Sequence, residues 1–286
     1  HQRHTILAPQ MSPVHFELMS AAFRGAGFNL VIPPLPDRAA IEEGLKYVNN
    51  DACYPTIIVI GQLIHALKSG EYDLNNTSIL LAQTGGGCRA TNYVAIARKA
   101  LRDAGMGQVP VLSLRKDNNS NFTLSWSLFK NLVISIIYGD LLMRVLYRIR
   151  PYERIKGSAD MLYESWAQKC KESLKNGRFS EFKRNIKGIV KDFDRLELRD
   201  VKKPRVGLVG EILVKFHPTA NNEIVKIVER EGAEAVMPDL MGFLFYCAYG
   251  ATFKKRYLSG SFKTKMLADI AIFIMEFYRK PMKKAL

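Results

Sequence analysis

Short apolar runs alternate with amphipathic stretches through the first 115 residues of the chain. Each run ends in a turn and is followed by apolar residues at helical spacing, as in the stretch behind Ser12 and Pro13, a helix-start pair. This alternation is typical of a parallel sheet covered by helices. It predicts strands over residues 5–11, 28–32, 78–83 and 109–114, and helices from residue 13 and over 39–48, 56–67 and 91–104.

The pattern changes after residue 116, where helical stretches over residues 124–147, 158–174 and 179–198 follow one another without strands. A strand–helix–strand pattern then returns over 205–213, 221–231 and 233–238, followed by helices over 241–257 and 262–278. We therefore predict an α/β fold of two Rossmann-like parallel-sheet lobes, with a helical insert between them and a cleft at the carboxyl ends of the strands. The predicted domains are an N-terminal lobe over 1–115, a helical segment over 116–203 and a C-terminal lobe with a terminal helix over 204–286.

The charge of the chain is strongly positive, with a formal net charge of +15 over 286 residues. Such a balance suits an acidic protein partner or a phosphorylated substrate. We expect no nucleic-acid partner, because no arginine-rich arm, RNA-binding aromatic signature or cysteine–histidine finger accompanies the charge. A solvated basic tail beside a neighbouring domain explains the excess equally well, since the chain begins at His1 without methionine and is interpreted as a piece of a longer protein. The cations crowd the last stretch: Lys254, Lys255, Arg256, Lys263, Lys265, Arg279, Lys280, Lys283 and Lys284.

The four cysteines are too sparse, in a chain of this length, for a disulfide-stapled secreted domain. No signal peptide opens the sequence. The most apolar windows are residues 56–67, which are too few to span a bilayer, and 128–146, which carry three charged residues. We therefore expect a cytoplasmic, reducing location and no membrane partner.

The stretch QTGGGCRATNY, residues 83–93, carries the strongest chemical signal. Glycines let the backbone approach a ligand closely, and Cys88 follows them at the start of a predicted helix, where free N–H groups and the helix dipole favour a thiolate. Gly86, Gly87 and Arg89 are therefore predicted to help Cys88 bind a cofactor, Arg89 by hydrogen bonds, although it equally well caps its own helix. A phosphate loop is the alternative, but the stretch has neither G-x-G-x-x-G nor G-K-[ST].

Two further cysteines lie near predicted strand or helix ends. Cys53 precedes the helix over residues 56–67, and Cys247 follows the predicted strand over 233–238. Because ligands of open α/β sheets bind beyond the carboxyl ends of the strands, Cys53, Cys88 and Cys247 are candidate metal ligands in one cleft, and thiolates are the usual ligands of iron–sulfur clusters. The spacing contains no compact C-x-x-C, so buried structural cysteines are the alternative. Cys170, flanked by lysines in a helical stretch, is predicted to be structural.

The stretch GLVGEILVKFHP, residues 207–218, places Glu211, Lys215 and His217 near the end of a predicted strand. Acid–base groups, ligands or ion-paired structural residues fit this pattern, and ion pairs are the commoner outcome. On the helix over 124–147, Asp140 and Arg144 are four residues apart, which predicts an ion pair.

These motifs together resemble a known family. NNDACYP, QTGGGCRATNY, YGDLL, RPYE and PRVGLVGEILVKFHPTAN are similar to the carboxyl-terminal part of activase–dehydratase fusion proteins, in the 2-hydroxyacyl-CoA dehydratase / benzoyl-CoA reductase superfamily. The resemblance covers roughly residues 5–257. It implies a component that carries a [4Fe–4S] cluster, or in some relatives a double-cubane cluster, and receives low-potential electrons from an ATP-dependent activase. By the same resemblance Cys53, Cys88 and Cys247 match the cluster-binding positions.

The resemblance leaves parts of the function open. The ATP-binding domain of the activase has no counterpart in this chain, so no ATP site is expected here, and the activase is expected as a partner. An acyl-CoA is the candidate substrate, and a homo-oligomer is a candidate assembly. Two alternatives remain: a non-catalytic scaffold or docking module whose basic tail binds the activase, and an enzyme with Cys88 as nucleophile, which needs a general base.

Overall fold

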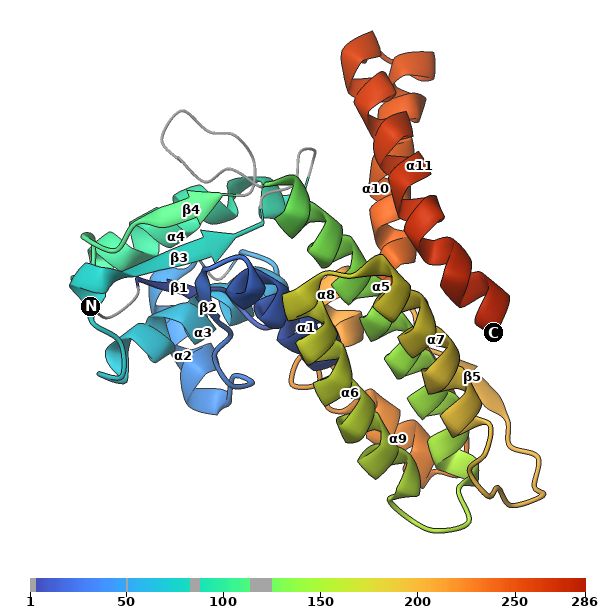
Figure 1. The fold of residues 1–286 in the computed structure, drawn as a ribbon. Coiled ribbons are helices and arrows are strands. Elements are labelled where there is room, and N and C mark those ends of the chain that lie inside the picture. Colours follow the sequence, from blue (N-terminus) through green and yellow to red (C-terminus); the bar gives the residue numbers. More distant parts are fainter. Residues whose placement is uncertain (1–3, 50, 83–87, 114–124) are drawn as a thin grey trace. The chain divides into compact units, whose positions relative to one another are not determined.

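The computed structural model describes residues 4–49, 51–82, 88–113 and 125–286, without the side chains of Arg89 and Asn176. Figure 1 draws its helices and strands along the chain. Contacts divide the chain into two compact units, the first formed by residues 1–129 and 213–224 and the second by residues 130–212 and 225–286. These bounds differ from the three segments expected from the sequence. The division into three domains stays a prediction. Each unit is described by itself below.

The first unit is built on a parallel sheet in the strand order β2-β1-β3-β4 (Figure 1). Thr5 of β1 pairs with Asn29 of β2 and with Thr77 of β3, and Ile79 of β3 pairs with Val111 of β4. The elements up to β4 are β1 (Thr5–Leu7), α1 (Pro13–Gly25), β2 (Asn29–Val31), α2 (Arg38–Tyr47), α3 (Tyr54–Lys68), η1 (Leu74–Asn76), β3 (Thr77–Leu81), η2 (Arg89–Asn92), α4 (Tyr93–Asp103) and β4 (Val111–Ser113).

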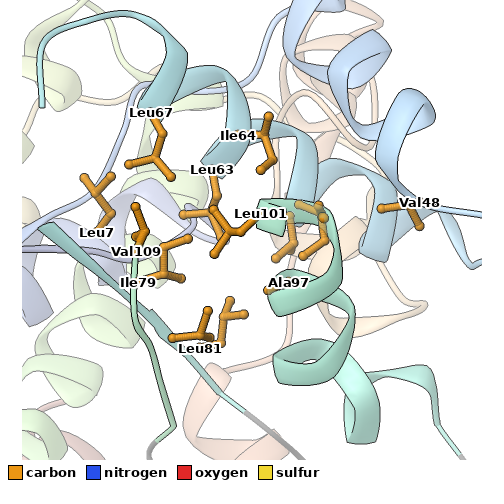
Figure 2. Close-up of a cluster of buried hydrophobic side chains, with 14 of the residues drawn as sticks. Leu7, Val48, Leu63, Ile64, Leu67, Ile79, Leu81, Ala97, Leu101 and Val109 are labelled. Carbon is orange, nitrogen blue, oxygen red and sulfur yellow. The ribbon is translucent and has the colours of Figure 1, made fainter. Parts of the chain in front are cut away.

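The core of the first unit lies between the sheet and helices α3 and α4. Leu7 and Ile79 from the strands meet Leu63 of α3 and Leu101 of α4 in one buried cluster, which Figure 2 draws. All four side chains are at most 1% exposed. Helix α3 is apolar on almost every face, so it is buried on almost every face, as expected for a helix in the centre of a domain.

The remaining elements follow β4. They are α5 (Trp126–Ile149), η3 (Arg150–Tyr152), α6 (Ser158–Asn176), α7 (Phe179–Phe193), β5 (Arg205–Gly207), α8 (Ile212–Phe216), α9 (Ile224–Arg230), β6 (Glu234–Val236), α10 (Leu240–Tyr257) and α11 (Phe262–Ala285). Strands β5 and β6 form a two-stranded parallel sheet within the described residues. The prediction of a mixed α/β fold with parallel sheets is confirmed, and helices without named strands follow one another from α5 to α7 as expected.

The predicted strands over residues 5–11 and 205–213 are wrong over most of their length, since β1 ends at Leu7 and β5 at Gly207. The expected strand over residues 205–213 ends at Gly207, and the chain enters the short helix α8 at Ile212. Three residues beyond this end, Gly210 has a φ of +142°, a backbone conformation outside the strand region that glycine adopts at little cost. Lys215 therefore lies within α8, and His217 follows it, so neither lies at the end of a strand.

In the second unit, the start of α10 is held by α5. The carboxylate of Asp140 accepts the backbone N–H groups of Leu240 and Met241 at 2.6 and 3.0 Å. Arg144, one turn further along α5, donates to Asp239 at 2.7 Å. Asp140 thus satisfies two of the free N–H groups at a helix N-terminus 100 residues away, a role that the local sequence does not predict.

Helices α2 and α3 approach each other through two glycines. A Cβ atom on Gly44 would lie 2.2 Å from the carbonyl oxygen of Ile57, and one on Gly61 would lie 2.1 Å from the carbonyl oxygen of Ala40. Real Cβ atoms do not come so close to backbone atoms, so a larger residue at either position forces the two helices apart. This contact fixes the distance between α2 and α3.

We predict that Gly44→Ala or Gly61→Ala lowers the free energy of unfolding by about 1–3 kcal/mol, because the added methyl group overpacks a helix contact. Urea unfolding followed by circular dichroism measures this change. Gly250→Ala on α10 is the matched control, since nothing lies within 4 Å of its Cβ position and its φ is not positive. It is expected to leave stability unchanged or to raise it by about 0.5–1 kcal/mol. Equal losses in all three variants would contradict the helix contact as the cause.

Candidate functional site

The carboxyl edge of the four-stranded sheet is where a ligand is expected in the first unit. The chain leaves β1 toward β2 on one side and β3 toward β4 on the other, so the strand order reverses between β1 and β3. Open parallel sheets bind ligands outside the carboxyl ends of their strands at such a reversal. Cys88 follows the end of β3 by seven residues, and the loop after β1 ends at Ser12, the N-cap of α1.

Helix α3 brings Cys53 to the same side of the sheet. The amide of Gln62, in the middle of α3, donates to the carbonyl of Pro34 at 2.6 Å, and its oxygen accepts the N–H of Gln10 at 2.9 Å. Gln10 and Pro34 lie after the carboxyl ends of β1 and β2. The first half of α3, with Cys53 at its start, therefore lies beyond the carboxyl edge.

Cys53 occupies the N-cap position of α3 with extended backbone angles. Pro55 follows in the first turn, where a missing N–H costs nothing because the group would have no partner inside the helix. The Sγ atom of Cys53 lies 3.0 Å from Oγ1 of the buried Thr56. Thr56 is therefore a polar neighbour of the Cys53 sulfur that sequence reasoning missed.

Cys88 has the same position one helix further along the chain. It caps η2, which runs directly into α4, and its Sγ atom accepts the N–H of Ala90 at 3.5 Å. Its side chain is exposed, like that of Cys53. The structure thus confirms that both cysteines stand at helix starts, as the glycine run and the turn before α3 predicted.

A cavity of about 810 Å³ lies between the two segments that carry these cysteines. One wall consists of residues 46–49, 51 and 52, and the other of Asn92, the N-cap of α4, with Ile96 and Lys99 on one face of that helix. The opposite face of α4, with Ala97 and Leu101, is buried in the core. Neither thiol is among the residues that line the cavity, so it neighbours the cysteines without containing them.

The other predicted ligands are placed as follows. Cys247 lies on α10 in the second unit and is exposed, so its meeting with Cys53 and Cys88 stays a prediction. Gly86 and Gly87 lie outside the described residues, and Arg89 opens η2 with a side chain that is likewise outside them. Within either unit, the described side chains contain no group of three or more His, Cys, Asp or Glu residues that is arranged to hold a metal ion.

The four cysteines differ in their surroundings. Cys170 is 0% exposed on α6, and burial raises the pKa of its thiol well above the usual range, as expected for a structural cysteine. Partial burial of the sulfur also raises the pKa of the Cys247 thiol, which disfavours its thiolate in the absence of a metal ion. Burial thus works against a thiolate at Cys247.

Comparisons of the chain with protein-family models, with curated proteins and with solved structures found no match. Among the residues that the structure describes, no helix has both the length and the apolar character needed to cross a membrane. The class of protein therefore has to be argued from the site itself, and the family resemblance of the motifs stays a prediction.

His217 is the most perturbed titratable group of the stretch GLVGEILVKFHP. It is 0% exposed, and burial lowers its pKa from 6.5 to about 4. Its Nδ1 atom accepts the N–H of Ala220 at 3.3 Å, which leaves the proton on Nε2. Nε2 has no hydrogen-bond partner among the described residues. His217 is thus held neutral, so the commoner of the interpretations left open by the sequence, an ion pair, does not describe it.

We predict that the protein loses stability as the pH falls from 6.5 toward 4, because the unfolded chain protonates His217 in this range and the folded chain does not. The contribution of His217 over this range is about 3 kcal/mol at most, from about 1.4 kcal/mol per pKa unit. Urea unfolding at pH 7 and pH 5 measures it. His217→Gln is expected to flatten the pH dependence, whereas His65→Gln, at an exposed site on α3, keeps it. Identical slopes in the two variants would disprove the assignment.

Proposed function

We propose that this chain is the iron–sulfur-carrying component of a low-potential electron-transfer system of the 2-hydroxyacyl-CoA dehydratase or reductase type. Cys53 and Cys88 are the proposed thiolate ligands of this chain's first unit, and Cys247 is the proposed third ligand. In this proposal the four-stranded sheet is a Rossmann-like lobe, and the cluster binds at its carboxyl edge.

The observation that carries the proposal is the shared position of Cys53 and Cys88. Both thiols are exposed, both cap the first turn of a helix, and both lie beyond the carboxyl edge of one parallel sheet. Helix starts supply N–H groups and a positive dipole end, which stabilise thiolates and the negative charge of a sulfide cluster. Two structural cysteines would have no reason to share this exposure and placement, and Cys170 provides the contrast.

The donor set fits an iron–sulfur cluster better than a hard cation. Cys53 and Cys88 supply soft sulfur ligands, and Thr56 supplies a hydroxyl that donates to one of them. Gly86, Gly87 and Arg89 are the proposed source of further N–H donors to the sulfur atoms. When bound, a cluster of this kind accepts and passes on single electrons at low potential.

The partner and substrate follow from the same proposal. An ATP-dependent activase supplies the electron, and an acyl-CoA thioester is the candidate acceptor. The residues of this chain bind and orient the cluster, while the cavity between the segment before Cys53 and α4 is large enough for a small ligand next to it.

We predict that anaerobic reconstitution with iron and sulfide gives a broad absorption near about 400 nm, as cysteine-ligated clusters do. The double variant Cys53→Ser/Cys88→Ser is expected to lose the absorption and the bound iron, because both proposed ligands are removed. Cys247→Ser is expected to lose part or all of the iron if the third ligand is assigned correctly.

Cys170→Ala is the matched control, since Cys170 is buried and takes no part in the proposed site. It should bind as much iron and acid-labile sulfide as the parent protein. If the triple variant of Cys53, Cys88 and Cys247 to Ala still bound the same amount of iron, the assignment would be wrong.

A non-catalytic docking module is the second candidate function, and the hairpin of α10 and α11 favours it. Large apolar side chains recur at helical spacing on both helices and are 47–75% exposed. They are Tyr246, Tyr249, Phe253 and Tyr257 on α10, and Phe262, Met266, Ile270, Phe273 and Phe277 on α11. Exposed apolar stripes of this size mark interaction surfaces.

The turn of the hairpin adds positive charge to this surface. Between Phe253 and Leu267 the sequence contains five lysine or arginine residues and no acidic residue. An acidic partner with an apolar face is therefore complementary to the hairpin. In this second proposal the activase docks on the hairpin, whether or not the chain carries a cluster.

We predict that Lys254→Glu/Lys255→Glu weakens binding of the partner activase by at least about tenfold at low ionic strength, because like charges then oppose docking. Lys156→Glu/Lys175→Glu is the matched control, with the same change of net charge at exposed positions away from the hairpin. Biolayer interferometry with purified activase measures both. Binding that is lost in Cys53→Ser/Cys88→Ser but kept in the hairpin variant would reject the docking proposal.

A further inference from the structure

A basic groove runs between helices α7 and α11 in the second unit, and we refer to it below as the α7–α11 groove. Its cavity volume is about 760 Å³. Ligand pockets for small molecules typically measure about 300–1,000 Å³, so the groove has the size for a small ligand. It is lined by Phe179, Lys183, Arg184 and Lys187 from α7 and by Phe277, Lys280, Pro281, Lys284 and Ala285 from α11.

The charge of the α7–α11 groove is one-sided. Five of its nine lining residues are lysine or arginine, and none is acidic. All five cations are exposed. Lys183 and Lys187 are four residues apart on α7, and Lys280 and Lys284 are four residues apart on α11, so each pair lies on one helix face.

None of these five cations forms an ion pair within the described part of the chain, whereas other cations of α11 do. Lys265 pairs with Asp269, Lys283 pairs with Glu276, and Arg279 pairs with Asp239. The acidic residues of α11 thus pair with Lys265, Arg279 and Lys283 and not with Lys280 or Lys284. Like charges at i and i+4 destabilise a helix by a few tenths of a kcal/mol, so the free protein keeps an unfavourable arrangement.

Two stacked aromatic rings form an apolar surface in the same groove. The ring centroids of Phe179 and Phe277 are 5.5 Å apart with planes inclined by 21°. Phe179 is also in contact with Phe182 and Tyr278, which fixes its position. Phe277 is 51% exposed, so part of its ring remains open to a ligand. Pro281 lies one turn further along α11 and adds a flat apolar group beside it.

We propose that the α7–α11 groove binds a nucleotide that carries at least two phosphate groups. The base stacks on the exposed part of Phe277, and the phosphate oxygens accept hydrogen bonds from Lys183, Lys187, Lys280 and Lys284. Arg184 provides a planar donor group for one phosphate. The negative charge of a polyphosphate relieves the repulsion within both lysine pairs. The exposed aromatic surface is the reason for proposing a ligand with an aromatic base. This proposal rests on the second unit alone and is independent of the proposed cluster.

Isothermal titration calorimetry at about 50 mM salt, a concentration at which exposed charges are weakly screened, tests the proposal with three probes. ADP is expected to bind, pyrophosphate to bind more weakly because it has no base, and adenosine to bind weakly or not at all because it has no charge. The double variant Lys187→Glu/Lys280→Glu is expected to lower the affinity for ADP by at least about tenfold. Phe277→Leu is expected to lower the affinity for ADP and leave that for pyrophosphate unchanged.

Lys254→Glu/Lys255→Glu is the matched control, with the same change of net charge on the exposed hairpin turn, and should bind ADP within about twofold of the parent protein. Circular dichroism verifies that each variant is folded. Absence of ADP binding would overturn the proposal, as would pyrophosphate binding that equals ADP binding and ignores Phe277. Binding of anionic vesicles or of oligonucleotides through the same lysines, without ADP binding, would also overturn it and assign the groove to a membrane surface or a nucleic acid.

Discussion

The close contact between α2 and α3 is the constraint on which the first unit depends. Gly44 and Gly61 let the two helices approach until backbone atoms of one helix touch those of the other. The turn that joins the helices ends at Cys53, so the contact also sets where this thiol stands. Helix α3 is buried on almost every face and packs beside α4, which follows Cys88. A change in the helix contact would therefore disturb the core and the candidate site together.

Part of this arrangement was predictable because it depends on local signals. Apolar runs and helical stripes gave the strands and helices of the first unit, and the glycine run and Pro55 marked both cysteines as helix starts. A right-handed crossover then leaves helix starts at the carboxyl edge of a parallel sheet. The failure over residues 205–213 has the opposite cause. The apolar residues there fit a strand, but the strand ends at Gly207 and the backbone at Gly210 is no longer in the strand conformation.

Interactions between distant residues were beyond the reach of the sequence. Asp140 and Arg144 have the spacing of a helix ion pair, yet Asp140 binds the N-terminus of α10 and Arg144 binds Asp239. For Asp140 and Arg144 the partner comes from a segment that only the fold brings near. For His217 the sequence left an acid–base group, a ligand and an ion-paired residue open, and the side chain is buried with a lowered pKa. The burial that lowers the pKa of His217 is likewise a property of packing.

The net charge of +15 is another property that the sequence alone leaves open to interpretation. The structure narrows the interpretation by showing which cations have acidic partners. The net charge alone is equally consistent with a solvated surface, a docking site and an anion-binding site. The ion pairs in the structure distinguish these possibilities. A cation with an acidic neighbour is already neutralised, as Arg279 is by Asp239. Lys280, next to Arg279 in sequence, faces the α7–α11 groove with lysines and aromatic rings and no acid. Two adjacent cations thus have different chemistry: one holds helix α11 in place, and the other is available to an anionic ligand.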